Sequence, residues 1–198
     1  VFSVISPIYF GQTYSVIHNN LNSENNEPET GVVYAVGADL SGKNFDNLNL
    51  QNAVFDMADL SNTSFKNTNI DGARFVHANL SNSNLLDRVD LSNINLARTD
   101  LSNVNLEGKN LTGTVLTGAD LTGSILTGAN LSAANLTFAD LTNANISQTN
   151  LSDAILFRSN LSGQDLRSAI STNTDFRYAI FSGSILPDSI LANNDLEY

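Results

Sequence analysis

A large apolar residue recurs at every fifth position through most of this chain, and this rhythm limits the possible folds more than any other feature. Leu, Phe or Ile occupies every fifth position from Leu40 to Leu85. After one extra residue the series resumes at Leu91 and continues to Leu196, with Ser171 as its one exception. An α-helix repeats every 3.6 residues and a strand every 2, so neither element alone explains a period of five.

Each five-residue unit has the composition of a short strand followed by a turn. The residue two positions before the large apolar centre is usually small, as at Ala119, and Asp or Asn stands between the two. In an extended segment the small and the large residue point inward, and Gly or Asn two positions after the centre suits a corner. A single unit cannot bury its centre, so the pattern predicts stacked coils over residues 38–198, with an insertion near 86–89.

The repeated letters resemble the A(D/N)LXX pattern of the pentapeptide-repeat family. The best matches are "ADLSN" at 58–62, "ADLTG" at 119–123, "ANLSA" at 129–133 and "ADLTN" at 139–143. The resemblance implies an all-β fold, a right-handed quadrilateral parallel β-helix with four units per coil and about eight coils. It also implies a range of roles, which include acidic DNA mimics that bind DNA gyrase and lumenal proteins, so the fold alone does not give the function.

Composition argues against several classes of protein. The formal net charge is −11, which disfavours direct binding to nucleic acid and to anionic membranes. The chain has no cysteine and no apolar stretch long enough to span a membrane. With only His18 and His77, and no readable nucleophile–base pair, metal-ligand spacing or phosphate loop, we expect no enzyme, cofactor or metal.

With four sides per coil, every twentieth residue falls in one column, and the first side carries an acidic column. It contains Asp39, Asp59, Asp100, Asp120 and Asp140, and no Lys or Arg lies in its units. Stacked like charges about 5 Å apart repel, so retention of protons or cations is one interpretation. Docking of a basic partner is another, and a solvated surface is the simplest.

The fourth side has a different character, because aromatic and basic side chains gather there. The residues that we expect to form a contact surface on it are Phe138, Phe157, Arg158, Arg177, Tyr178 and Tyr198. Aromatic residues and arginine are typical of interface centres. An acidic side and an apolar–basic side on one molecule also suit lateral pairing.

Residues 1–37 precede the repeats and have the composition of a strand-rich extension or cap. We expect its apolar residues to bury themselves, on the first coil or on a neighbouring molecule: Val1, Phe2, Val4, Ile5, Ile8, Tyr9, Phe10 and Tyr14. At the other end, the outward-facing Ile185 and Ile190, together with Leu196, suit a buried junction. Coils capped at one end and open at the other can stack head to tail.

These features predict a non-enzymatic structural or interaction protein that associates with itself into a fibre or surface assembly. Because the chain begins at Val1 rather than Met, removal of a signal peptide and an extracellular or cell-surface location are expected. The alternatives are a cytoplasmic, acidic DNA mimic that binds DNA gyrase, and a lumenal or periplasmic scaffold. A separate protein partner also remains open.

Overall fold

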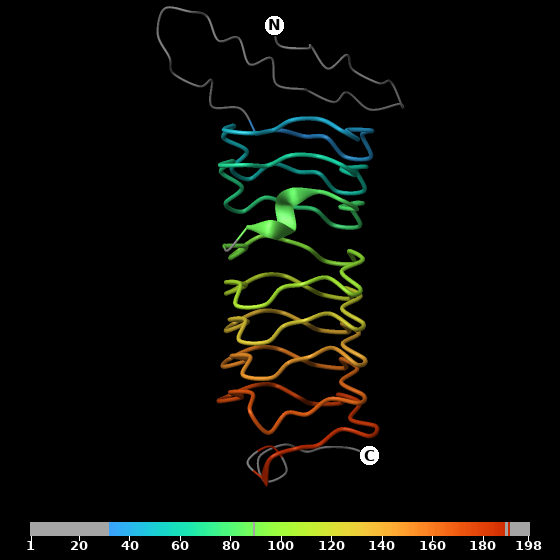
Figure 1. The fold of residues 1–198 in the computed structure, drawn as a ribbon, viewed down its shortest axis with the longest axis vertical. Helices are drawn as coiled ribbons and strands as arrows, with labels where there is room; N and C mark the ends of the chain where they lie inside the picture. The colour runs from blue at the N-terminus through green and yellow to red at the C-terminus, as the bar shows by residue number, and fades with distance from the viewer. Residues whose placement is uncertain (1–31, 89, 189, 191–198) are drawn as a thin grey trace, which may run out of the picture. The chain divides into compact units, whose positions relative to one another are not determined.

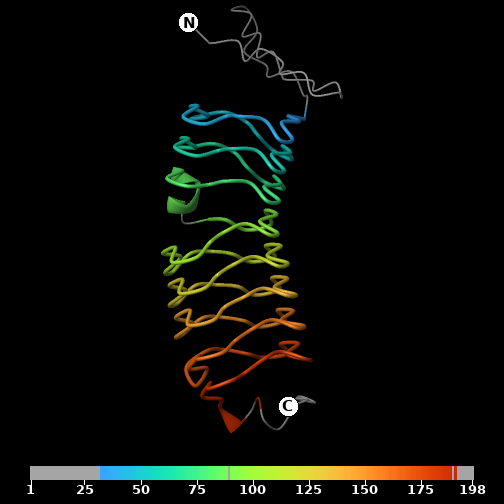
Figure 2. The ribbon, with the colours of Figure 1, turned by 90° about the vertical axis from the view of Figure 1, so that its right-hand side faces the viewer.

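The computed structural model describes residues 32–88, 90–188 and 190, so the expected extension 1–37 lies outside it except for residues 32–37. The chain divides into two compact units, Val1–Leu85 and Leu86–Tyr198. Within each unit the backbone winds in stacked coils, which run from blue to green in the first and from green to red in the second (Figures 1 and 2).

Coils in the first unit stack with a register of twenty residues. Parallel bridges join Tyr34 to Val54 and Val54 to Arg74, and the other three sides of the coil show the same spacing. Backbone hydrogen bonds run on both sides of each bridge: Ala35 N donates to Val54 O at 2.8 Å, and Val54 N donates to Val33 O at 2.8 Å. Twenty residues are four five-residue units, so the prediction of a four-sided parallel β-helix is confirmed.

The second unit has the same register, displaced by the one extra residue. Its bridges run from Asp90 through Asn110 and Asn130 to Asn150 and Ile170, and three further columns repeat the spacing. Each side of a coil forms a single bridge, because the extended segment of each unit is only three residues long: the small residue, the bridge residue and the large centre. A turn follows this segment directly. Coil formation therefore depends on stacking between coils rather than on long strands.

The interruption in the rhythm coincides with the 3₁₀ helix η1, Asn84–Asp87. In a regular coil Phe45 N donates to the backbone carbonyl of Ser64, at 2.8 Å. One coil later, Phe65 N donates instead to the side-chain Oδ1 of Asn84, at 2.6 Å. The side-chain amide of Asn84 thus replaces a backbone acceptor where the backbone leaves the coil.

The interior of each unit is built from the repeated centres and from the small residues two positions before them. Leu121 and Leu126 are fully buried, and so is the small residue between them, Ser124. Where Thr occupies the small position, its hydroxyl bonds to a backbone carbonyl: Thr114 Oγ1 donates to Leu91 O at 2.8 Å. Buried hydroxyls are tolerated because most of them find such an acceptor.

Candidate functional site

The predicted acidic face is a true column within each unit. Asp39 bridges to Asp59 in the first unit, and Asp100, Asp120 and Asp140 bridge successively in the second. Their carboxylates are exposed or half-buried. Stacking of the five predicted aspartates therefore follows the twenty-residue register, unit by unit.

These carboxylates close turns. Thr122 N donates to Asp120 Oδ1 at 2.9 Å, and the same bond is made to an asparagine elsewhere, where Ser132 N donates to Asn130 Oδ1 at 3.1 Å. Such side-chain bonds to a backbone N–H two residues ahead explain why Asp and Asn alternate at this position of the repeat. Sequence reasoning missed this role, although the D/N alternation was its visible signal.

The turn bonds also shift the titration of two carboxylates in the column. Hydrogen bonds from the hydroxyl and backbone N–H of Ser41 lower the pKa of Asp39, and the same pair of groups in Ser102 lowers the pKa of Asp100. These hydrogen bonds favour the charged form of the two carboxylates.

Metal-ligating side chains do not gather in the described part of the chain. Among residues 32–88, 90–188 and 190, no group of three or more His, Asp or Glu is placed to hold a metal ion. His77 is exposed, and His18 lies outside the described residues.

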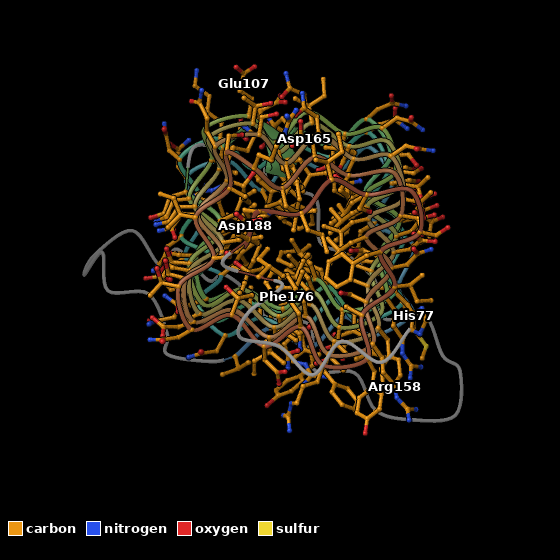
Figure 3. The ribbon with its side chains drawn as sticks, turned by 90° about the horizontal axis from the view of Figure 1, so that it is seen from below. His77, Glu107, Arg158, Asp165, Phe176 and Asp188 are labelled. Atoms are coloured by element: carbon orange, nitrogen blue, oxygen red, sulfur yellow. The ribbon has the colours of Figure 1, made fainter. Side chains whose placement is uncertain are left out.

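On the fourth side, the structure brings five of the predicted contact residues into one cluster, which we call the aromatic corner: Phe138, Phe157, Arg158, Arg177 and Tyr178. The rings of Phe138 and Phe157 have their centroids 6.3 Å apart, and those of Phe157 and Tyr178 lie 5.4 Å apart. The guanidinium carbon of Arg158 lies 5.9, 5.4 and 5.6 Å from the centroids of Phe138, Phe157 and Tyr178. In Figure 3, Arg158 projects outward from the coil, whereas Phe176 points into it.

Three members of the aromatic corner hold a backbone conformation that bulky residues avoid. Phe138, Arg158 and Tyr178 have φ angles of 59°, 55° and 60°, in the left-handed region. This conformation costs an L-residue about 1–2 kcal/mol, and most corners of the coil avoid that penalty with Gly or reduce it with Asn. Three further large residues at positive φ occupy the corresponding corner position of other coils: Met57, His77 and Arg98.

The strain therefore follows one corner of the coil. The residues at this corner stand two positions after a centre of the fourth side, as Phe138 follows Leu136. Sequence reasoning identified the side but not the strain. The signal was present in the bulky residues at the position that elsewhere carries Gly or Asn.

The last described coil exposes apolar residues, but the predicted set needs one correction. Ile185 is exposed as predicted, with 47% of its surface accessible, and so is Ile180. Ile190 is buried, with only 2% accessible, so its predicted outward orientation is wrong. The backbone departs from the regular coil there, because Ile190 N donates to Pro187 O at 3.0 Å.

The remaining predicted contact residues lie outside the described residues. They are Val1, Phe2, Val4, Ile5, Ile8, Tyr9, Phe10, Tyr14, Leu196 and Tyr198. Within the described ranges, no helix has both the length and the apolar character that a membrane crossing requires.

A family model and several solved structures match this chain. The model of the pentapeptide repeats matches in 8 copies, over residues 34–67, 44–87, 58–96, 85–118, 115–153 and 154–193. No curated protein matches the sequence.

Among solved structures, the chain is similar to HetL of the cyanobacterium Nostoc sp. strain PCC 7120, a pentapeptide repeat protein involved in heterocyst differentiation regulation. The identity is 22% over 78% of this chain and 91% of that one, with a TM-score of 0.31. Rfr23 of the cyanobacterium Cyanothece 51142 is 26% identical over 75% and 90%, with a TM-score of 0.33. A pentapeptide repeat protein of the Arabidopsis thaliana thylakoid lumen is 28% identical over 61% and 69%, with a TM-score of 0.28.

Proposed function

Because the chain belongs to the pentapeptide-repeat family of right-handed quadrilateral β-helices, we propose that it is a structural subunit that stacks end to end with copies of itself. Members of this family are generally structural or interaction proteins rather than enzymes. The product of this stacking is a fibre or a surface assembly, in which residues 1–31 contact a neighbouring molecule.

The observation that carries the proposal is a set of outward-facing isoleucines in the last described coil. Ile170, Ile180 and Ile185 are about half exposed. They bridge to Asn150, Asn160 and Asp165 of the preceding coil, so an apolar side chain replaces a polar one on three sides at once. Large exposed apolar residues on three sides of this last described coil favour burial against another molecule.

The first described coil supplies the matching surface. Val54 N and Asp59 N donate to the coil before them, but the backbone N–H groups of Tyr34, Asp39 and Asn44 have no acceptor among the described residues. We propose that these N–H groups donate to another chain, as the edge of a β-sheet can. A second copy whose last coil meets this edge, or whose residues 1–31 add a strand to it, continues the ladder.

Electron microscopy of the purified full-length protein tests the proposal. We expect filaments from the natural sequence and none after Ile180→Asn and Ile185→Asn are combined, because most earlier coils carry Asn or Asp at these positions. The matched control combines Ile125→Asn and Ile155→Asn, which remove exposed isoleucines from inner coils and should leave the filaments unchanged.

Removal of residues 1–17 tests the role of the N-terminal segment separately. The truncated protein should keep its β-type circular dichroism spectrum and lose the filaments. Filaments of normal length without residues 1–17 would show that the segment has no part in assembly.

Two outcomes would favour the alternative functions. A species of uniform size that inhibits supercoiling by DNA gyrase would support an acidic DNA mimic, and a monomer with neither property would support a lumenal or periplasmic scaffold. The proposal extends to an extracellular or cell-surface location. Fractionation of the producing cells that finds all of the protein in the cytoplasm would contradict that part.

A further inference from the structure

We infer that the aromatic corner of the second unit is the docking site for residues 1–31 of the next copy in the assembly. This inference rests on the end-to-end stacking proposed above, and it specifies where the N-terminal segment of one molecule binds its neighbour. In this arrangement the segment follows the fourth side of the neighbour's last coils. The open edge of the first coil is then left to the last coil of that neighbour. Four observations lead to this assignment.

The first observation is that bulky, exposed residues hold a strained conformation at this corner. Phe138, Arg158 and Tyr178 have left-handed φ angles and are exposed. Gly118 holds the same corner position one coil before Phe138, with a φ of 65°, so glycine fits this corner without the strain. Backbone strain of this kind is typical of functional sites.

The second observation is the chemistry that the corner presents. Phe138 and Tyr178 expose 55% and 47% of their surface. The guanidinium of Arg158 lies over both rings, and no carboxylate among the described residues lies within ion-pair distance of it. An occupant that fits this corner offers apolar side chains to the rings and carboxylates to the guanidinium.

The third observation is that the N-terminal segment has this combination. Residues 1–17 contain no charged side chain and are rich in Val, Ile, Phe and Tyr. The residues that follow carry Glu24, Glu27 and Glu29, and no Lys or Arg occurs anywhere in the segment. Because the whole chain has a net charge of −11, these carboxylates approach another copy most favourably at a cationic group.

The fourth observation is the position of the corner. Tyr34, close to the first described residue, bridges to Val54 on the fourth side of the first unit. Tyr178 ends the fourth side in the last described coil of the second unit, and Phe138 holds the same place two coils earlier. When two copies stack with like sides in line, the N-terminal segment of one leaves its coil beside the corner of the other.

The linking residues are long enough for this contact. Residues 18–31 span up to about 46 Å when extended, at about 3.3 Å per residue. Two coil steps and one side of a coil together measure about 27 Å, from about 4.8 Å between coils and five residues per side. A segment tethered this close reaches an effective concentration in about the millimolar range, so modest contacts hold it in place.

Disulfide cross-linking of the full-length protein tests the docking directly, because the chain has no cysteine of its own. Thr137→Cys places a thiol beside the corner, and it is combined in one chain with a cysteine in place of Ser6, Ser15 or Ser23. Under mild oxidation, at least one of the three chains should give a ladder of covalent oligomers on a denaturing gel. The matched control replaces Thr127 instead, which also follows a leucine centre but lies on the opposite side of the coil, and should give no ladder.

The products separate this inference from the proposed function. A ladder with none of the three Thr137→Cys chains would overturn the inference, and filaments from the natural sequence would then still support end-to-end stacking. A monomer with an internal disulfide would place the segment on its own molecule and would also overturn the inference. Ladders from a protein that forms no filaments would confirm the docking and contradict the fibre.

Reversal of charge tests the part of Arg158. Arg158→Glu should raise the protein concentration needed for filaments by at least about tenfold. The matched control is Arg167→Glu, which makes the same charge change on another side and should have no effect. Glu24→Arg and Glu27→Arg added to the Arg158→Glu chain should restore filaments at the original concentration, and failure to restore them would contradict the predicted ion pairing.

Substitution of the strained residues separates docking from folding. Phe138→Asn combined with Tyr178→Asn places a residue suited to the left-handed region at both corners. Tm, measured below the concentration at which filaments form, should therefore rise. The concentration needed for filaments should rise by about tenfold, because the rings that receive the segment are gone. A lower Tm with unchanged filaments would show that the two residues serve the coil alone.

Discussion

The two units build the same four-sided coil around different interiors. In residues 32–85, phenylalanines occupy the centres of two sides: Phe45 stacks on Phe65 with centroids 5.0 Å apart, and Phe55 stacks on Phe75 at 5.4 Å. Rings from the two stacks meet edge to face, as Phe55 meets Phe65 at 6.3 Å. From Leu91 to Leu166 every centre is Leu or Ile. The contrast shows that the five-residue period determines the four-sided backbone, whereas the type of residue at each centre determines how the interior packs.

The aromatic interior depends on particular pairs of rings, whereas the aliphatic interior repeats one contact many times. Edge-to-face and offset stacks have preferred geometries, so each Phe in the first unit is fitted to its neighbours. Leucines stacked from coil to coil have no such preferred geometry, so the packing in one coil is equivalent to that in the next. We therefore expect the two units to respond differently to the same kind of substitution.

The largest expected effect is the loss of a ring from the aromatic stacks. Phe55→Ala should lower the free energy of unfolding of its unit by about 3–5 kcal/mol, because the ring is fully buried and contacts three others. Hydrogen exchange of the full-length protein measures the loss unit by unit. Leu126→Ala in the second unit is the comparison, at about 2–4 kcal/mol. A loss at Phe55 no larger than that at Leu126 would show that ring pairing adds nothing.

Exchange of the two centre types is the next test. Leu126→Phe should destabilise the second unit by about 1–3 kcal/mol, because a ring overfills an interior packed around leucines. The reciprocal change, Phe65→Leu, should cost the first unit about 1–2 kcal/mol by leaving its stack incomplete. If both changes are neutral in hydrogen exchange, the two interiors are interchangeable and the comparison fails.

A smaller effect should be common to both units, because it concerns the backbone rather than the centres. Thr68 donates its hydroxyl to Phe45 O and Thr114 donates to Leu91 O, both at 2.8 Å. Thr→Val at either position should cost about 1–2 kcal/mol in urea unfolding. Ser124→Ala is the control and should be neutral or slightly stabilising, because the buried Ser124 hydroxyl has no partner among the described residues.

The smallest effect concerns acid. A hydrogen bond from Arg167 lowers the pKa of Asp165 from 3.8 to about 2. A hydrogen bond from Arg177 also lowers the pKa of Asp175. Since the folded-state pKa lies below the unfolded value, this stabilisation is present above about pH 4 and is lost as the pH falls toward 2. The urea midpoint should fall over this window, and Asp165→Asn should flatten the fall. An unchanged slope in that variant would contradict the assignment.

Much of the fold was predictable, because the centres and the small residues before them follow from a period of five and from burial. The stacking of Asp120 on the aspartates of the neighbouring coils was predictable for the same reason. The sequence did not reveal that the Asp120 carboxylate closes a turn, because that bond depends on backbone direction. It also misplaced Ile190, since the rhythm alone does not say where coiling stops. The strain at Phe138 required the φ angle, although the unusual residue at a Gly or Asn position was visible.

One amide at η1 has a consequence for how such a chain changes through evolution. Asn84 gives Phe65 an acceptor where the main chain has turned away, so one side chain repairs the ladder that an inserted residue would open. We therefore expect the preceding coil to keep this bond when residues are inserted after Asp87. By the same argument, a foreign peptide grafted after Asp87 should leave the coil before it folded.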